Sequence, residues 1–391
     1  MKRFSAQYII TNSGNPLKRA IITTEDDGTI INVEDTEGNL KEKHSVEFHN
    51  GIIIPGFVNC HCHLELSYMK GSFIPGGGLS VFLEQVRNSR NNTPDAITKS
   101  ASSADNDMYY DGVSLCADIC NTSLSFNVKQ GSRIKYISLL EVFGIDPVKA
   151  ARRMEDLLEV AATAQEMNLP FSMVPHAVYS MSLPLLRLLK GKSEKNKITS
   201  IHFMETDGEE TFLKNNAGPL LTSFKHSSLM PSNPEMAKNH ADAVLNEITL
   251  SGNLILVHNT FADRETIRKI KVRKNLFWCL CPDSNIYIEN KIPPVNLLLE
   301  EGCEIVIGTD SLASNDKLSI LEELKTLQRY FPFLSIEELV RWGTLNGAKA
   351  LCEEDLFGKI EAGKKPGLLL LENVDLQNMK LLPDSVVRRL I

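Results

Sequence analysis

The sequence predicts an α/β fold: a (β/α)8 TIM-like barrel with a small β-sandwich domain built from both chain termini. Three observations carry this prediction. Eight short apolar segments recur along the chain, helical patterns lie between them, and both ends of the chain are strand-like. We expect the barrel to span residues 55–358 and the small domain to combine residues 1–54 with residues 359–391.

The eight apolar segments are predicted to be strands buried on both faces, because their hydrophobicity is nearly continuous rather than alternating. Most of them end in a polar or ionisable residue. A strand followed by a helix, repeated eight times, is the order of a barrel whose active site lies at the C-terminal ends of the strands. The segments are 52–61, 112–118, 136–141, 171–176, 198–202, 254–258, 276–281 and 304–310.

Helical patterns fill the intervals between these segments. In residues 147–168, and again in residues 318–330, apolar side chains recur every three or four positions. This spacing gathers them on one face, as in a helix that packs against a sheet. The expected stripes are Met154, Leu157, Leu158 and Ala161 in the first helix, and Ile320, Leu321, Leu324 and Leu327 in the second.

The two ends of the chain do not fit the barrel pattern. Short strand-like stretches within residues 1–54 are separated by polar, glycine-containing turns. Residues 367–371 and 385–391 are also strand-like. Since the barrel lies between them, we expect the two ends to meet in one β-domain. The turns are expected at residues 12–14, 26–28 and 37–39.

Charge and composition limit the classes of partner. The chain has 391 residues, of which 42% are hydrophobic and 23% charged, as is ordinary for a globular protein. Its formal net charge of -7 argues against nucleic acid or an anionic membrane as a partner. No apolar stretch approaches the ~18 residues of a membrane span, and the first residues lack the pattern of a signal peptide. We therefore expect a cytoplasmic protein that binds a small-molecule substrate.

Eight cysteines are spread along the chain. Two pairs, Cys60 with Cys62 and Cys279 with Cys281, have a spacing that could ligate zinc. Both pairs lie inside apolar strand-like runs, whereas structural zinc knuckles usually sit on tight turns. Buried, reduced thiols are therefore the favoured interpretation.

The first candidate metal ligands are His61 and His63, at the end of the first segment. In a strand, residues two apart point to the same side, so two imidazoles can converge on one metal ion. A pair of surface histidines is the alternative. His202 closes the fifth segment and could supply a third imidazole, although a structural histidine is the commoner case. Glu205, three residues later, could reach a metal-activated water and shuttle protons.

His258 and Asp310 end the sixth and eighth segments. Asp310 could bind a metal and accept a proton from water, and His258 could hydrogen-bond the water or an oxyanion. The alternative for Asp310 is the N-cap of the next helix, a role that Ser311 could also fill. In all, five ionisable residues fall at four strand ends of one predicted barrel mouth. Three histidines and a carboxylate suit zinc or iron(II) with room for a hydroxide.

These motifs, in this order, resemble the amidohydrolase superfamily, specifically its branch of cytosine, guanine and S-adenosylhomocysteine deaminases and chlorohydrolases. The resemblance covers essentially the whole chain. Residues 358–367 resemble the return from barrel to β-domain in that branch. The matching stretches are Pro55-Gly-Phe-Val-Asn-Cys-His-Cys-His-Leu-Glu65, His202-x-x-Glu205, Val257-His258, Cys281-Pro-Asp-Ser-Asn285 and Gly308-Thr-Asp-Ser-Leu-Ala-Ser-Asn315.

The resemblance implies metal binding by four residues, catalysis by three and substrate contact by two. The metal ligands would be His61, His63, His202 and Asp310, the catalytic residues Glu205, His258 and Asp310, and the substrate-binding residues Glu65 and His176. For Glu65 and His176 a purely positioning role is the alternative. Cys62 replaces the usual small or hydroxyl residue, which should change packing more than chemistry. The fourth segment has no lysine near its end, and binuclear relatives use a carboxylated lysine there, so we expect one metal ion.

The functional prediction is a metal-dependent aminohydrolase that deaminates an amino-purine or adenine nucleoside. Residues 64–67 and 311–316 resemble the bacterial members that deaminate aminodeoxyfutalosine, which makes this the favoured individual substrate. Guanine, cytosine, S-adenosylhomocysteine, methylthioadenosine and halogenated triazines are alternatives. The missing lysine disfavours a binuclear cyclic-amide hydrolase, and the intact ligand set disfavours a non-catalytic relative. The expected cofactor is one divalent ion, zinc before iron(II), and the resemblance favours a homodimer.

Overall fold

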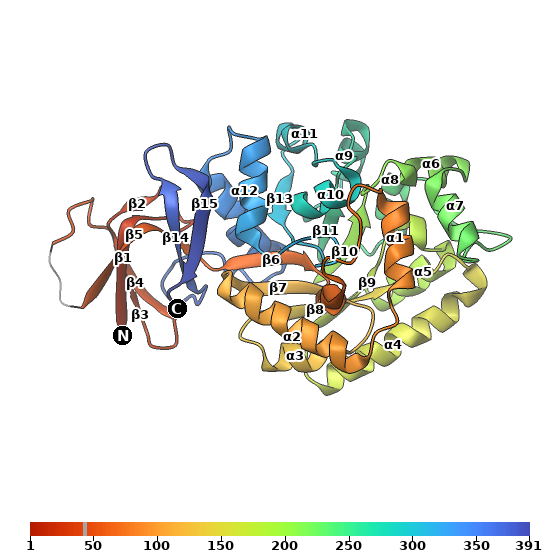
Figure 1. Cartoon of the computed structure of the whole chain (residues 1–391), viewed down its shortest axis with the longest axis horizontal. Helices are drawn as coiled ribbons and strands as arrows, with labels where there is room; N and C mark the ends of the chain where they lie inside the picture. Colours follow the sequence, from red (N-terminus) through yellow and green to blue (C-terminus); the bar gives the residue numbers. More distant parts are fainter. Residues whose placement is uncertain (42–44) are drawn as a thin grey trace.

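A computed structural model describes residues 1–41 and 45–391 and shows a barrel with a β-domain attached at one end (Figure 1). Both chain termini lie in the β-domain, and the segment between them forms the barrel, as the sequence predicts. Strand β5 ends at Pro55, and strand β14 begins at Leu368. The domain limits at 54–55 and 358–359 stay a prediction.

The barrel contains a strand from each of the eight predicted segments, but residues 52–55 of the first segment belong to β5, and its barrel strand begins at Phe57. The eight strands form two four-stranded parallel sheets, ordered β6-β7-β8-β9 and β10-β11-β12-β13. The α/β barrel predicted from the sequence is therefore confirmed. The strands are β6 (Phe57–Cys62), β7 (Val113–Cys120), β8 (Lys135–Val142), β9 (Phe171–Pro175), β10 (Ile198–Phe203), β11 (Asn253–His258), β12 (Leu276–Leu280) and β13 (Glu304–Ile307).

Backbone hydrogen bonds close the barrel at the two seams between these sheets. At the first seam, the amides of Thr309 and Asp310 donate to the carbonyl of His61, at 2.9 and 3.1 Å. At the second, the amide of His202 donates to the carbonyl of His176 at 2.8 Å. Both seams thus run through residues that the sequence places in the site.

Buried side chains drawn from all eight strands fill the barrel interior, as expected for strands covered on both faces. Cys60 and Cys279 belong to this interior cluster, beside Val58 and Val257. All eight cysteines of the chain are free thiols. The cysteines of both Cys-x-Cys pairs thus pack among buried apolar side chains.

The strands of the β-domain form one seven-stranded mixed sheet, ordered β15-β14-β5-β1-β3-β4, with β2 paired to β1. This sheet has its own apolar core, which joins Phe4 and Ile22 from one chain end to Leu368 and Leu370 from the other. The strands are β1 (Lys2–Ile9), β2 (Leu17–Lys18), β3 (Ile21–Thr24), β4 (Ile30–Glu34), β5 (Val46–Pro55), β14 (Leu368–Asp375) and β15 (Lys380–Arg389).

The expected turns of the β-domain are present. Asn12, Gly28 and Gly38 have φ of 61°, 92° and 79°, the left-handed region that Gly and Asn adopt most readily. The hydrogen-bonded sheet is continuous from one chain end to the other, because β14 pairs with β5 in antiparallel register over Ile52–Pro55 opposite Leu368–Leu371. This pairing carries the chain ends to the base of the barrel.

Helices surround the barrel strands (Figure 1). Helix α12 (Ile320–Tyr330) buries all four residues of its predicted stripe, and α4 (Ala150–Glu166) buries Met154, Leu157 and Ala161 of its own. Leu158 was expected in that stripe but is 37% exposed, because it lies one position past Leu157 and rotates off the buried face. No helix of the described residues is long and apolar enough to cross a membrane.

The α-helices are α1 (Leu79–Asn88), α2 (Pro94–Tyr110), α3 (Phe126–Gly131), α4 (Ala150–Glu166), α5 (Leu183–Lys192), α6 (Gly208–Asn215), α7 (Pro219–His226), α8 (His240–Asp242), α9 (Arg264–Ile270), α10 (Pro282–Glu289), α11 (Val295–Glu300), α12 (Ile320–Tyr330), α13 (Ile336–Arg341) and α14 (Gly347–Ala350). The 3-10 helices are η1 (Leu64–Met69), η2 (Pro147–Lys149) and η3 (Val178–Ser180), and the π-helices are η4 (Ala243–Glu247) and η5 (Trp342–Asn346).

Candidate active site

His61 and His63 lie at the end of the first barrel strand, β6. The pairing of β6 with β7 shifts register between Asn59 and Cys62, which is an irregularity of the kind that re-aims side chains next to active sites. The Nε2 atoms of the two imidazoles are 3.1 Å apart, and both side chains are buried. The predicted convergence of this pair is therefore present.

His202, from the end of β10, and Asp310, from the loop after β13, complete the group. Nε2 of His202 is 3.3 Å from Nε2 of His63. Oδ1 of Asp310 is 3.4 Å from Nε2 of His63 and 3.7 Å from Nε2 of His61. Three imidazole nitrogens and one carboxylate oxygen thus face a common point.

Neighbouring groups fix the orientation of these side chains. Nδ1 of His202 lies 2.8 Å from the carbonyl oxygen of His176, so this nitrogen carries the hydrogen and Nε2 is the free base. The hydroxyls of Ser284 and Ser314 each donate to Oδ2 of Asp310 at 2.6 Å, which leaves Oδ1 free to bind a metal ion. Such outer hydrogen bonds are typical of metal centres.

Asp310 is not a helix N-cap. The next helix, α12, begins at Ile320 with Ser319 as its N-cap, so that alternative is wrong for Asp310 and for Ser311. Asp310 instead has a left-handed backbone, with φ of 58°. A non-glycine residue in this region is uncommon, and such residues cluster at functional sites.

The electrostatics of the centre fit a divalent cation. Burial, together with the neighbouring imidazole of His61, lowers the pKa of His63 well below its usual range, and burial lowers that of His202 to about 3. Burial alone would raise the pKa of Asp310, but the hydrogen bond from His61 and the other imidazoles hold it well below its usual value. Neutral imidazoles beside an ionised carboxylate are the protonation states that metal ligands need.

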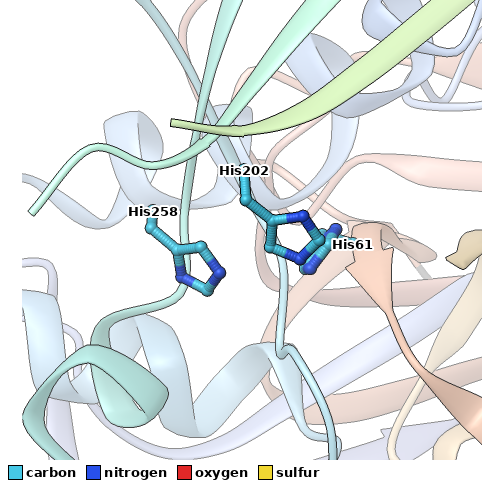
Figure 2. Close-up of side chains that lie close together, drawn as sticks. All are labelled: His61, His202 and His258. Carbon is cyan, nitrogen blue, oxygen red and sulfur yellow. The ribbon is translucent and has the colours of Figure 1, made fainter. Parts of the chain in front are cut away.

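Groups of His, Asp and Glu that could hold a metal ion therefore occur at the strand ends. One group is His61, His63 and Asp310, a second is His61, His202 and His258, and a third is Glu141, His176 and His202. Figure 2 shows the rings of the second group turned toward one space. The first two groups share His61 and describe one centre.

Glu205 and His258 lie side by side at this centre. Nε2 of His258 is 3.5 Å from Oε1 of Glu205. Burial and the nearby carboxylate of Asp310 raise the pKa of Glu205 well above its usual value, which favours its protonated form. His258 has a left-handed backbone, with φ of 76°, and its Nδ1 lies 3.1 Å from the side-chain amide nitrogen, Nδ2, of Asn285. A carboxyl whose environment favours its protonated form thus adjoins a fixed, buried imidazole.

His176 lies against the centre from the end of β9. Its ring stacks on His202, with ring centroids 4.6 Å apart, and its Nδ1 is 2.8 Å from the hydroxyl of Ser180. Burial lowers the pKa of His176 to about 3. The side chain lines the cavity above the centre, which is compatible with the predicted substrate contact.

Glu65 points elsewhere. Its Oε2 accepts from the amides of Asn121 and Thr122 at 3.3 and 3.2 Å, and its Oε1 accepts from the hydroxyl of Ser125 at 3.4 Å. Both oxygens are therefore occupied by the loop after β7, and the side chain is not among those that line the cavity. This favours the positioning role over substrate contact.

A cavity of about 330 Å³ opens above the centre. It includes groups for which the sequence analysis predicts no role, such as Glu141, Tyr179, Arg87 and Arg90. Glu141 ends the third predicted segment, so the strand-end rule could have found it. The other three lie on η3 and on or just after α1, and no periodic signal marks them.

The chain matches the model of the amidohydrolase family over residues 52–388. An adenosine deaminase of Helicobacter pylori is 28% identical over 354 residues, which cover 88% of this chain and 85% of that protein. A 5'-deoxyadenosine deaminase of Methanococcus vannielii is 26% identical over 386 residues, covering 89% and 84%.

Solved structures give the same result. The structure of Helicobacter pylori aminofutalosine deaminase in complex with methylthio-coformycin superposes with a TM-score of 0.80, at 25% identity, and covers 96% of this chain and 93% of that one. The zinc complex of atrazine chlorohydrolase from Arthrobacter aurescens shares the fold, with a TM-score of 0.72 at 17% identity, covering 98% and 89%. With this fold, these relatives and this metal-binding histidine cluster, the chain belongs to the amidohydrolase family, as a deaminase-type hydrolase of carbon–nitrogen bonds.

Proposed function

We propose that the protein uses one divalent metal ion, zinc before iron(II), to deaminate an adenine-type nucleoside, with aminodeoxyfutalosine as the favoured individual substrate. The observation that carries this proposal is the convergence of His61, His63, His202 and Asp310 beside the buried carboxyl of Glu205. The deaminases of adenine nucleosides among the relatives support the substrate class.

The geometry supports one ion rather than two. A second ion would have to be bound by Glu141, His176 and His202. Since Nε2 of His202 faces the first centre, this ion would need a lone pair on Nδ1 of His202, which lies 3.5 Å from Oε1 of Glu141. That nitrogen instead donates its hydrogen to the carbonyl of His176 at 2.8 Å. The strand before His176 also carries no lysine that could bridge two ions. One centre, held by the four proposed ligands, is what these contacts favour.

The residues around the centre divide the proton transfers. A divalent ion held by His61, His63, His202 and Asp310 would make water a nucleophile at neutral pH by lowering its pKa towards ~7. Asp310, whose pKa is held low, is the acceptor for the proton of the attacking water. Glu205, whose pKa is held high by burial, donates to the ring nitrogen next to the reacting carbon. His258, beside Glu205, orients the water. The proton taken up by Asp310 then passes to the exocyclic amine, which leaves as ammonia, and the hydroxyl proton on the reacting carbon returns to Glu205.

Replacement of Glu205 tests the proposal. Glu205→Gln keeps the size and polarity of the side chain but cannot exchange a proton. We expect ammonia release from adenine nucleosides to fall by about 10²- to 10⁴-fold. Metal content, measured by mass spectrometry of the dialysed protein, should stay at one ion per chain. Glu210→Gln is the matched control, because Glu210 lies on α6, shortly after Glu205 in the chain, and its side chain is exposed.

The substrate panel contains adenosine, 5'-deoxyadenosine, methylthioadenosine, S-adenosylhomocysteine and aminodeoxyfutalosine, with guanine, cytosine and a chlorotriazine as the competing classes. Near wild-type turnover in Glu205→Gln would refute the catalytic assignment. Two tightly bound ions per chain would refute the single centre. A preference for guanine, cytosine or the triazine would refute the adenine-type substrate. The homodimer stays a prediction, which sedimentation of the same preparation checks.

A further inference from the structure

A second buried carboxyl lies next to Glu205. Glu209, in the first turn of α6, is 0% exposed, and its Oε1 accepts from the backbone amides of Glu205 and Thr206 at 2.7 and 3.2 Å. Glu205 lines the active-site cavity, whereas Glu209 is not among the side chains that line it. Glu209 therefore contacts the backbone of Glu205 without reaching the space in which a substrate would lie.

The other oxygen of Glu209 faces an imidazole. Oε2 lies 2.6 Å from Nε2 of His240, on α8, and the side chains of both residues are buried. Because a carboxylate only accepts hydrogen bonds, Nε2 of His240 carries the hydrogen and donates it. The ring of His240 packs edge-to-face on Phe203, the last residue of β10, with ring centroids 5.3 Å apart. The pair of Glu209 and His240 is thus anchored to the strand that carries His202.

The backbone between β10 and Glu205 has a conformation that needs support. Met204 has φ of 50°, in the left-handed region that residues other than glycine and asparagine seldom adopt. Its carbonyl accepts from the amide of Phe261 at 2.9 Å, so the chain is held by Phe261 before Glu205 and by Glu209 at Glu205 itself. Such conformations persist where the surrounding structure fixes them. These contacts therefore set the direction in which the Glu205 side chain leaves the backbone.

A capping role for α6 accounts for only part of this arrangement. Thr206 and Glu209 have the spacing of a capping box, in which the carboxylate accepts from the amide three residues before it. That hydrogen bond is 3.2 Å long, however, and the shorter one, of 2.7 Å, comes from the amide of Glu205. Burial of a charge is costly unless the charge is paired and hydrogen-bonded. A carboxylate that is fully buried and paired with His240 thus favours a role that an exposed cap could not fill.

Glu209 also acts on Glu205 through its charge. Burial and the carboxylate of Asp310 raise the pKa of Glu205, and the charge of Glu209 adds to this effect. The same residue therefore holds the backbone of Glu205 and favours the protonated form of its carboxyl, which is the form that a general acid needs.

We propose that Glu209, supported by His240, is a positioning residue that fixes the carboxyl of Glu205 for its proton transfers. The inference rests on the proposed function, because it takes Glu205 as the group that exchanges protons with the substrate. A displacement of about 1 Å in a reacting group can reduce a rate about 100-fold. Loss of the contacts made by Glu209 should therefore reduce kcat far more than it weakens substrate binding.

A double-mutant cycle between Glu209 and Glu205 tests the inference. Glu209→Gln keeps the size of the side chain, but its NH2 group must face either the two amides or Nε2 of His240, all of which are donors. We expect kcat for ammonia release from an adenine nucleoside to fall about 10- to 100-fold and KM to change less than about threefold, at unchanged metal content. In the Glu205→Gln protein the same substitution should change kcat less than about twofold, because the group that Glu209 positions is already lost.

His240→Phe is the second variant, and it decides the inference where Glu209→Gln does not fold. It keeps a ring against Phe203 but removes the donor to Glu209, so kcat should fall about 10-fold in the wild-type background and less than about twofold in Glu205→Gln. Glu210→Gln is the control, because Glu210 also lies in the first turn of α6 but is exposed, and kcat should equal that of the parent protein in both backgrounds. A wild-type kcat in Glu209→Gln, or an equal fall in both backgrounds, would overturn the inference in favour of a structural cap.

A measurement without substrate separates this inference from the proposed function. Hydrogen exchange, followed by mass spectrometry with fragmentation to single residues, reports on the amides of Glu205 and Thr206. In Glu209→Gln these amides should exchange about 10- to 100-fold faster than in wild type, the factor that a hydrogen bond to a charged group contributes. If no nucleoside releases ammonia, the proposed function fails, and the exchange rates still decide whether Glu209 holds this backbone. Unchanged exchange at both amides would overturn the inference.

Discussion

A fully buried ion pair under the active site gives the sharpest stability prediction. Nζ of Lys129 lies 2.5 Å from Oδ2 of Asp118, and both side chains are 0% exposed. The same ammonium donates to Sγ of Cys120 at 2.7 Å and to the hydroxyl of Ser138 at 3.1 Å. Burial alone would lower the pKa of Lys129, but the carboxylate of Asp118 more than offsets this and raises it. The lysine is therefore charged, and its removal leaves an uncompensated anion.

The magnitude follows from this geometry. Lys129→Met keeps the volume of the side chain but leaves the Asp118 carboxylate with the backbone amide of Leu64, 2.7 Å from Oδ1, as a neutral donor. Breaking a buried pair by removing one partner typically costs about 3–5 kcal/mol. The added variant Asp118→Asn removes the stranded charge, and the amide oxygen can still accept from Leu64. We expect the double variant to regain at least about 2 kcal/mol relative to Lys129→Met.

Urea denaturation of the metal-loaded protein, followed by circular dichroism, measures these free energies of unfolding. Lys269→Met is the control: its ion pair with Asp242, at 3.1 Å, is half exposed on both sides, so its loss should cost less than about 1 kcal/mol. The reasoning would be refuted by a cost below about 1 kcal/mol for Lys129→Met, or by a double variant less stable than that single variant. Either result would mean that the pair is hydrated or dispensable.

Three further predictions concern the surroundings of the site. Ser284→Ala removes one of the hydrogen bonds to Oδ2 of Asp310 and should weaken metal affinity about 10- to 100-fold in a competition titration with a chelator, with no change in fold. Gly308→Ala should abolish metal binding, because a Cβ there would lie 2.7 Å from Cβ of His61; unchanged metal content would contradict this. Burial raises the pKa of Asp283, so the folded state holds this proton more tightly than the unfolded state does, and ionisation opposes folding as pH rises above about 4. The stability of Asp283→Asn relative to wild type should therefore increase as the pH rises from 4 to 7. A difference in melting temperature between variant and wild type that is the same at pH 4 and at pH 7 would contradict this.

The strands were predictable because their sequence signal is local. Near-continuous apolar runs mark strands covered on both faces, and all eight are present. Histidines two apart at the end of such a run predict convergence, which His61 and His63 show. Leu158 failed for the same local reason: a periodic pattern places a stripe to within about one residue and cannot decide which side of the stripe meets the sheet.

The parts of the site that the sequence missed depend on tertiary contacts. Arg87 and Arg90 reach the cavity because α1 lies across the barrel mouth and is tied to α7 through Ser223. Glu65 follows the ligand motif but turns to the loop after β7, whose amides face it. Ser284 reaches Asp310 from the segment after β12. No periodicity or spacing in the sequence predicts these contacts, since each contact joins segments that are far apart in the chain.

The positions of the proposed ligands give the metal a second consequence. The barrel consists of two four-stranded half-barrels, and isolated backbone bridges, Cys62 with Asp310 and Ala177 with His202, join them at the seams. His61 and His63 come from the first half, whereas His202 and Asp310 come from the second. An ion held by all four would therefore cross-link the two halves. Because such an ion binds the closed barrel and not the open chain, its affinity adds to the stability of closure. The same backbone bonds that close the barrel thus bring the ligands together, which explains why the site lies at the strand ends.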